Sequence, residues 1–274
     1  MNTTGSAVEA IGGLYEGERL APALEDARAR TLALYAHLDL ESLAVPCLPI
    51  VNPPLWELAH IAWFQERWCL RYEPSSGSLA RDSMLPGADA LFDSGAVAHD
   101  TRWTLAYPPA KVLMGYMSST LAATLETIDR AGADRRYFLE LALLHEDMHG
   151  EALLMTLQSL GLPAPSLGAR VPQRSTSPKP RDVQFKGGSF QLGTASGGEA
   201  FVFDNEKWAH AVTVAPFAMR ASPVTQGEYR AFVEGGGYER RDLWTDEGWA
   251  WRESLGACAP VYWNTGSSTA FGGA

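Results

Sequence analysis

The chain has 274 residues, enough for two domains of ordinary size, and its hydrophobic content of 46% is that of a globular protein. Its formal net charge of −10 argues against a nucleic-acid partner and against an anionic membrane surface, because both require positive charge. No run approaches the roughly 18 apolar residues of a membrane span, and no signal peptide is visible, so we expect a cytoplasmic protein.

The first half of the chain predicts helices separated by breaks. Residues 1–18 are small and polar, and we expect a disordered tail. Apolar residues at helical spacing predict a first helix over residues 20–40. Asn52 followed by two prolines is a helix-start signal, with Asn52 as the cap, and predicts a second helix over residues 53–72.

Residues 74–108 are rich in Ser, Gly, Pro and Asp and predict a long loop, which is often functional in a compact domain. A third helix is predicted over residues 109–130. A fourth is predicted over residues 134–160, with Asp134 as its N-cap. Four helices of this length indicate a bundle over residues 19–161.

The second half has a different texture. Residues 162–182 are rich in Pro, Ser and Arg and are interpreted as a linker. Residues 183–274 predict an irregular domain rich in Gly and Trp, with short strands and one short helix over residues 225–234. The three cysteines are far apart and form no Cys-x-x-Cys motif, so no disulfide framework or zinc knuckle is expected.

The fourth predicted helix carries the most informative pattern. His145 and His149 are four residues apart and share a helix face, so two imidazoles can hold one metal ion. Two buried histidines with hydrogen-bonded partners are the plainer alternative. The expected core face comprises Phe138, Leu141, Ala142, His145, Met148, His149, Ala152 and Thr156. The expected solvated stripe comprises Glu140, Asp147, Glu151 and Gln158.

Three interpretations of this helix remain open. His145-Glu-Asp-Met-His149 matches the zinc protease signature, in which Glu146 is the general base, although no downstream third ligand follows. The motifs Glu57-x-x-His60 and Glu146-x-x-His149 also match a di-metal bundle, with Glu25 or Glu126 as further ligands.

The third interpretation takes His60, His145 and His149 as three ligands to one metal. His60 lies on the second predicted helix, within an aromatic face. Neutral imidazole suits iron, zinc and copper alike. Three protein ligands leave open positions for substrates, but the spacing does not identify the metal.

Several segments together carry a resemblance to a known family. Residues 52–66, 85–94, 99–103 and 144–151 resemble the DinB-type bundle of the ergothioneine-type sulfoxide synthases, and most resemble the selenoneine synthase branch. Residues 187–193, 223–232, 236–238 and 247–251 resemble the formylglycine-generating-enzyme (sulfatase-modifying-factor) domain, a C-type-lectin-like fold. The resemblance therefore implies an α+β protein in which a DinB-like four-helix bundle precedes a formylglycine-generating-enzyme-like domain.

The resemblance also implies a chemistry. Relatives of this kind are nonheme iron enzymes that join hercynine to a sulfur or selenium donor, a thiol or a selenosugar, using O2. Their three-histidine Fe(II) site matches His60, His145 and His149 in this sequence. Trp56 and Trp63 are candidates to line the pocket, and packing in the core is the equal alternative.

Two further positions matter for the donor. Arg102 matches the loop in which relatives hold the donor's carboxylate, although its spacing alone favours an ordinary surface position. Met148 stands where sulfur-type relatives often carry a glutamine that contacts the imidazole substrate, so that contact and the usual donor are not carried over. Together with the likeness to the selenoneine synthase branch, this leads us to favour selenium. The second domain is expected to be incomplete after Trp263, so a truncated metal-binding paralogue without turnover is the alternative. The sequence assigns no acid–base catalyst.

Overall fold

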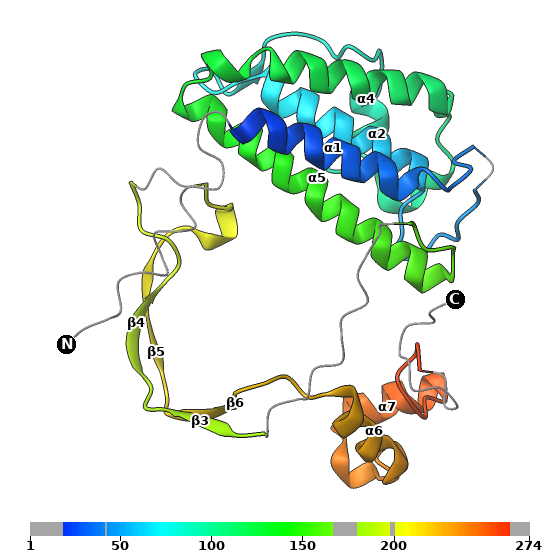
Figure 1. Cartoon of the computed structure of the whole chain (residues 1–274), viewed down its shortest axis with the longest axis vertical. Helices are drawn as coiled ribbons and strands as arrows, with labels where there is room; N and C mark the ends of the chain where they lie inside the picture. The colour runs from blue at the N-terminus through cyan, green and yellow to red at the C-terminus, as the bar shows by residue number, and fades with distance from the viewer. Residues whose placement is uncertain (1–18, 42, 167–179, 198–200, 264–274) are drawn as a thin grey trace. The chain divides into compact units, whose positions relative to one another are not determined.

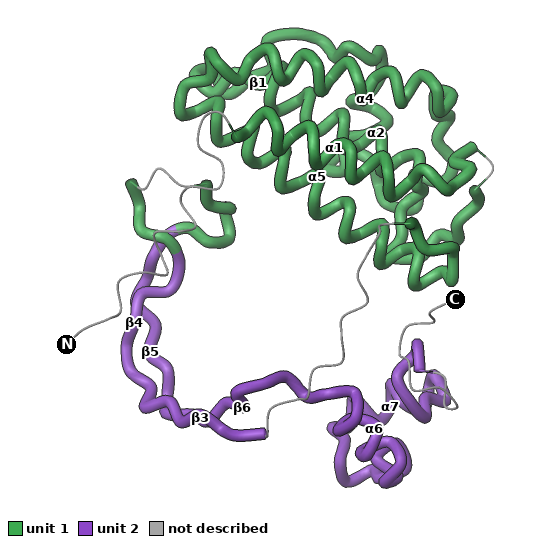
Figure 2. Tube along the Cα trace, viewed as in Figure 1, with its two compact units in different colours: residues 1–171, 194–207 green, residues 172–193, 208–274 purple. Residues whose placement is uncertain are grey.

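A computed structural model describes residues 19–41, 43–166, 180–197 and 201–263 (Figure 1). The chain divides into two compact units (Figure 2). Unit 1 combines residues 1–171 with 194–207, and unit 2 combines residues 172–193 with 208–274. Contacts thus group residues 194–207 with the helical unit, whereas the sequence assigns them to the second domain. The expected tail and most of the expected linker lie outside the described residues.

Four long helices of unit 1 lie side by side as a bundle (Figure 1). Helix α1 packs against α5, and α2 packs against both α4 and α5. The fold class predicted from the sequence is thereby confirmed for this half of the chain. The helices are α1 (Leu20–Tyr35), α2 (Pro54–Gln65), α4 (Ala110–Leu125) and α5 (Ala133–Leu160).

The helix ends differ from the predicted ones. Helix α1 ends at Tyr35 rather than near residue 40, and α2 continues as a π-helical segment, Glu66–Arg71. After α4 the chain forms a short 3-10 helix, Ile128–Arg130. These shorter elements reflect breaks in backbone hydrogen bonding that apolar spacing does not reveal.

The predicted N-caps were wrong at both helices. The N-cap position of α2 is Pro53, because the side-chain oxygen of Asn52 instead accepts a hydrogen bond from Arg102 at 2.8 Å. The N-cap of α5 is Gly132, and Asp134 lies within the first turn, where its charge favours the helix dipole. The predicted end of α5 is confirmed, since Gly161 adopts φ 64° beyond Leu160.

The long connection between α2 and α4 contains short elements rather than a plain loop. Strands β1 (Tyr72–Glu73) and β2 (Ser78–Leu79) pair in antiparallel fashion, and they are followed by α3 (Ala88–Phe92) and a 3-10 helix, His99–Trp103. The buried carboxylate of Glu66 accepts hydrogen bonds from the hydroxyls of Ser83 and Tyr116. The segment is therefore tied to the bundle core.

Unit 2 is built from two antiparallel strand pairs and two short helices. Strand β3 (Asp182–Phe185) pairs with β6 (Phe217–Arg220), and β4 (Gly188–Leu192) pairs with β5 (His210–Val214). Helix α6 (Gln226–Glu234) begins after Thr225, whose hydroxyl accepts from the Glu228 backbone N–H. A 3-10 helix (Arg241–Leu243) and α7 (Asp246–Leu255) follow, and α7 is not among the elements predicted from the sequence.

Gly187 lies between two strands that belong to different pairs. Its φ is 73°, a region that favours glycine, and it separates β3 from β4. An added Cβ would lie 2.4 Å from the backbone oxygen of Val214. Any side chain at this position would therefore collide with the backbone of residues 214–216, which connect β5 to β6.

The two units differ in how much apolar surface they bury. Among the described residues, every buried hydrophobic side chain except Tyr238 belongs to unit 1. Trp56, Leu58, Phe92, Leu113 and Leu153 are central to the larger of two apolar clusters there. No helix in the described part of the chain combines the length and apolarity that crossing a bilayer requires.

Candidate metal centre

Three histidines from two helices converge inside unit 1. His60 comes from α2, and His145 and His149 come from consecutive turns of α5. One side-chain nitrogen from each of the three lies within 4.8 Å of the others. The Nε2 atoms of His145 and His149 are 3.2 Å apart. The structure thus brings together the three residues that the sequence nominates as ligands.

Hydrogen bonds on the far side of two rings determine which nitrogen is free. The Nδ1 atom of His60 lies 2.8 Å from the backbone oxygen of Phe92. Nδ1 therefore carries the proton and donates a hydrogen bond to that oxygen. The Nδ1 atom of His149 lies 2.9 Å from Oε1 of Glu57 and donates in the same way. Both rings therefore keep an Nε2 lone pair for a metal.

Aromatic rings hold the imidazoles in place. Trp56 stacks on His60 with ring centroids 4.7 Å apart and an interplanar angle of 7°, and Trp63 stacks on it at 5.6 Å. Phe64 stacks on His145 at 3.7 Å. Each aromatic partner comes from the same helix, α2, so one helix supplies a ligand and covers another.

The surroundings keep two rings neutral. Burial, reinforced by His149, lowers the pKa of His60 to about 3. Burial followed by the two neighbouring histidines lowers the pKa of His145 well below its ordinary value. Neutral imidazole is the form that ligates metals. A dication between the rings would attract the nitrogen lone pairs that the three rings hold close together. The donor set and its tautomers therefore fit a metal ion such as iron or zinc.

Glu146 does not face the three histidines. Its carboxylate is 2% exposed and accepts hydrogen bonds from Arg28 at Nε (2.7 Å) and Nη2 (3.1 Å). Arg28 also donates to Gln65 and to the backbone oxygen of Met117. A carboxylate held in a buried ion pair is not placed to act on metal-bound water, which contradicts the protease interpretation.

The di-metal interpretation fails on the same helices. Glu57 hydrogen-bonds to His149 instead of facing the shared space as a ligand, and Glu146 is engaged by Arg28. Glu25 and Glu126, the further ligands that this interpretation requires, are both exposed. The described residues therefore form a three-histidine group without the carboxylates of a second metal site.

The expected substrate-binding residues are placed differently from one another. Trp56 and Trp63 are buried and donate their indole N–H groups to Leu91 O and to Asp89, so they pack around His60. Arg102 is 8% exposed, with its guanidinium 3.9 Å from the Trp56 ring centroid, so the surface reading of Arg102 was wrong. Met148 is 47% exposed rather than on the core face.

Other site details escaped the sequence reading. Glu140, expected in the solvated stripe, is buried, and burial raises its pKa. The carbonyl of Phe92 orients His60, but a backbone oxygen leaves no residue-type signal in a sequence. The sequence pattern indicates Glu57 only as a possible metal ligand. Its three-residue offset from His60 did not suggest that it serves the other helix.

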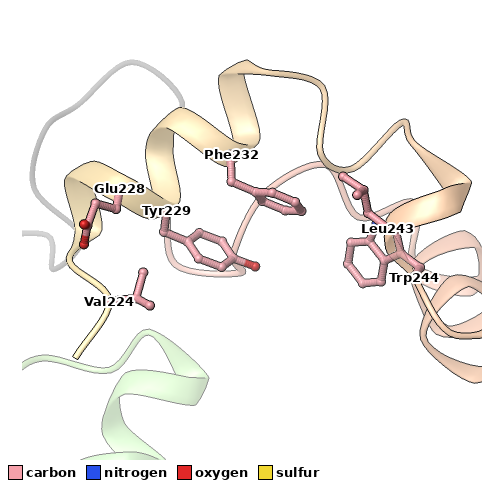
Figure 3. Close-up of a pocket in the computed structure, with 6 residues that line it drawn as sticks. All are labelled: Val224, Glu228, Tyr229, Phe232, Leu243 and Trp244. Atoms are coloured by element: carbon pink, nitrogen blue, oxygen red, sulfur yellow. The ribbon is translucent and has the colours of Figure 1, made fainter. Parts of the chain in front are cut away.

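Unit 2 contains a cavity of about 390 Å³ that is separate from the histidine group (Figure 3). Tyr229, Phe232 and Trp244 form its aromatic wall. Its polar groups are engaged within the unit, since Glu228 pairs with Arg220 and the Trp244 indole donates to Gly237 O. The remaining lining residues are Val224 and Leu243.

Comparison with known proteins covers both halves of the chain. Residues 23–153 match the DinB superfamily, and residues 168–269 match the sulfatase-modifying factor enzyme 1-like domain. The chain is similar to the hercynine oxygenase of Mycolicibacterium smegmatis, with 35% identity over 259 residues, which is 93% of this chain and 59% of that protein.

Two further relatives agree. The hercynine oxygenase of Mycolicibacterium thermoresistibile is 35% identical over 257 residues, covering 92% of this chain and 56% of the relative. That of Mycobacterium tuberculosis is 32% identical over 255 residues, covering 92% and 59%. The chain therefore spans less than two thirds of the length of the curated relatives that it matches.

Proposed function

The chain belongs to the ergothioneine-synthase-like family, and from that premise we propose that its bundle holds one Fe(II) ion and serves an O2-dependent reaction that joins hercynine to a sulfur or selenium donor. The observation that carries the proposal is the convergence of His60, His145 and His149 within 4.8 Å. Three protein ligands leave coordination positions open, as catalytic metal sites require. When bound, Fe(II) supplies those open positions and the redox chemistry that O2 needs.

The protein's own residues prepare this site. Phe92 and Glu57 hold the rings of His60 and His149 so that Nε2 of each faces the shared space. Phe64 covers one face of His145 and excludes water from it. Because the rings are positioned before a metal arrives, little rearrangement is needed when it binds.

For the substrates we propose that the exposed side chain of Met148 borders the open side of the site, between His145 and His149 in sequence. An apolar thioether there in place of an amide favours a donor other than the usual thiol, and we favour a selenosugar. Arg102 remains our candidate for a donor carboxylate, because its Nε has no hydrogen-bond partner among the described residues. Trp56 and Trp63 support the site by packing on His60.

The first test is metal content. We expect one Fe(II) per chain after anaerobic loading, and loss of that iron in His145→Ala, because two imidazoles hold a metal much less tightly than three. Arg30→Ala, which removes an exposed ion pair to the neighbouring Asp147, is the matched control and should retain the iron. Two metal atoms per chain, or iron retained without His145, would contradict the proposal.

The second test is turnover. The iron-loaded protein is incubated with hercynine, O2 and either a thiol or a selenosugar, and the products are analysed by mass. The selenium preference is supported by an adduct with the selenosugar alone, and it is overturned by an adduct with the thiol alone. Stoichiometric iron without any adduct would favour a metal-binding protein without turnover.

A further inference from the structure

We infer that Glu57 is a positioning residue for His149, and that it makes the three imidazoles chemically unequal donors. The inference rests on the proposed metal site and extends it to a residue outside the ligand set. Glu57 lies on α2 one turn before His60, yet its carboxylate reaches the ring of His149 on α5. The helix that supplies one ligand thus orients a ligand of its neighbour.

The charge balance around Glu57 points to a cation. The side chain is 1% exposed, and no Lys or Arg nitrogen of the described residues lies within 4 Å of its carboxylate. Its hydrogen-bond partners there are Nδ1 of His149 at 2.9 Å and the hydroxyl of Tyr35 at 3.4 Å. Arg102 interacts with Glu57 electrostatically but forms no ion pair with it, and a buried carboxylate without an ion-paired Lys or Arg is costly. A metal on the opposite nitrogen of His149 would add positive charge through the ring, on the side where Glu57 makes its shortest hydrogen bond.

The other two rings lack such a partner. His60 donates to a neutral carbonyl, that of Phe92, and the buried Nδ1 atom of His145 has no hydrogen-bond partner within the described segments. A carboxylate increases the electron donation of an imidazole more than a carbonyl does. His149 would therefore be the strongest donor of the three to a bound metal.

Glu146 provides a matched control. It occupies the same place in the second Glu-x-x-His motif and is similarly buried, but its carboxylate pairs with Arg28 and makes no hydrogen bond to the three histidines. Glu57→Gln and Glu146→Gln therefore make the same chemical change at equivalent positions. Both keep a hydrogen-bond acceptor and remove the charge.

The experiment measures Co(II) and anaerobic Fe(II) affinity by competition with a chelator, on the full chain. We expect Glu57→Gln to weaken metal binding roughly 10–100-fold, the effect of losing an outer-sphere partner, and Glu57→Leu to weaken it further. We expect Glu146→Gln to change the affinity less than about threefold, since the carboxylate of Glu146 makes no hydrogen bond to a ligand. Equal affinity for wild type and Glu57→Leu would overturn the inference.

A spectroscopic measurement separates positioning from general damage. In the Co(II)-loaded protein, the exchangeable Nδ1–H proton of each ligating ring gives a resonance shifted by the metal. We expect Glu57→Gln to move one of these resonances and to leave those of the other two rings in place, whereas a loosened bundle would move all three. If Glu57→Gln does not fold, Tyr35→Phe replaces it, with a smaller shift of the same resonance expected and no shift overturning the inference.

The outcomes also distinguish this inference from the proposed function. Wild-type protein that binds neither Co(II) nor Fe(II) would overturn both. Wild-type protein that binds one metal with an affinity indifferent to Glu57 would overturn the inference and leave the three-histidine site intact.

Discussion

In the turn of α2 that carries His60, Glu57 reaches across to His149, whereas in the turn of α5 that carries His149, Glu146 turns away to Arg28 on α1. The two turns share one residue pattern, and both carboxylates are buried. Their partners differ, because α2 faces the histidines of α5 while the Glu146 side of α5 faces α1. The same motif therefore serves the metal centre in one helix and the stability of the bundle in the other.

The largest expected effect is a loss of stability when the ion pair between Glu146 and Arg28 is removed. In Glu146→Leu the guanidinium of Arg28 stays buried without its carboxylate, which is expected to destabilise the protein by about 3–5 kcal/mol. Urea unfolding of the metal-free protein measures this loss.

Glu57→Leu is the matched control for that experiment. It leaves no Arg or Lys without an ion-pair partner, so its loss in the same measurement should be smaller. Equal losses for the two variants would show that the two carboxylates do not have separate roles.

A second prediction concerns pH and the rings themselves. The pKa of His60 falls from 6.5 to about 3 on folding. Below pH 6.5 the unfolded chain therefore binds a proton at this ring that the folded metal-free protein does not bind. The contribution of the neutral His60 ring to the free energy of unfolding is fully present above pH 6.5 and is lost as the pH falls towards 3. The slope from this ring is about 1.4 kcal/mol per pH unit. Unfolding of wild type and His60→Gln between pH 7 and 5 measures the difference, and parallel slopes would contradict it.

The smallest expected effect concerns the hydrogen bond from Tyr35 to Glu57, beside the metal centre. Tyr35→Phe removes the hydroxyl that donates to Glu57 Oε2 at 3.4 Å, a long hydrogen bond. We expect a stability loss of about 0.5–1.5 kcal/mol and a fall in Co(II) affinity smaller than that of Glu57→Gln. Thermal unfolding and chelator competition test the two parts, and an affinity loss that exceeds that of Glu57→Gln would place the critical contact at Tyr35 instead.

Apolar spacing and helix-start signals predicted the four helices, and the shared face of His145 and His149 follows from helix geometry. The choice of His60 as third ligand needed the family resemblance as well. The hydrogen-bond partners of the buried polar side chains could not be predicted from the sequence. Asn52 has the sequence features of a cap, but the burial of Arg102, 50 positions away, redirects its side chain.

The same limit explains the remaining errors within the site. Glu140 and Met148 were assigned to opposite faces of α5 from their polarity, yet Glu140 is buried and Met148 is exposed. Which side of a helix is covered depends on where its neighbours pack, and a single helix pattern does not contain that information. Long-range contacts between buried polar groups must therefore be taken from the structure.

The most direct test of the central claim is X-ray absorption at the iron edge of the Fe(II)-loaded protein. The account predicts one iron per chain with the scattering pattern of three imidazole rings, and the loss of one ring in His60→Ala. Scattering from fewer than three imidazoles in the wild type, or from a second iron nearby, would contradict it.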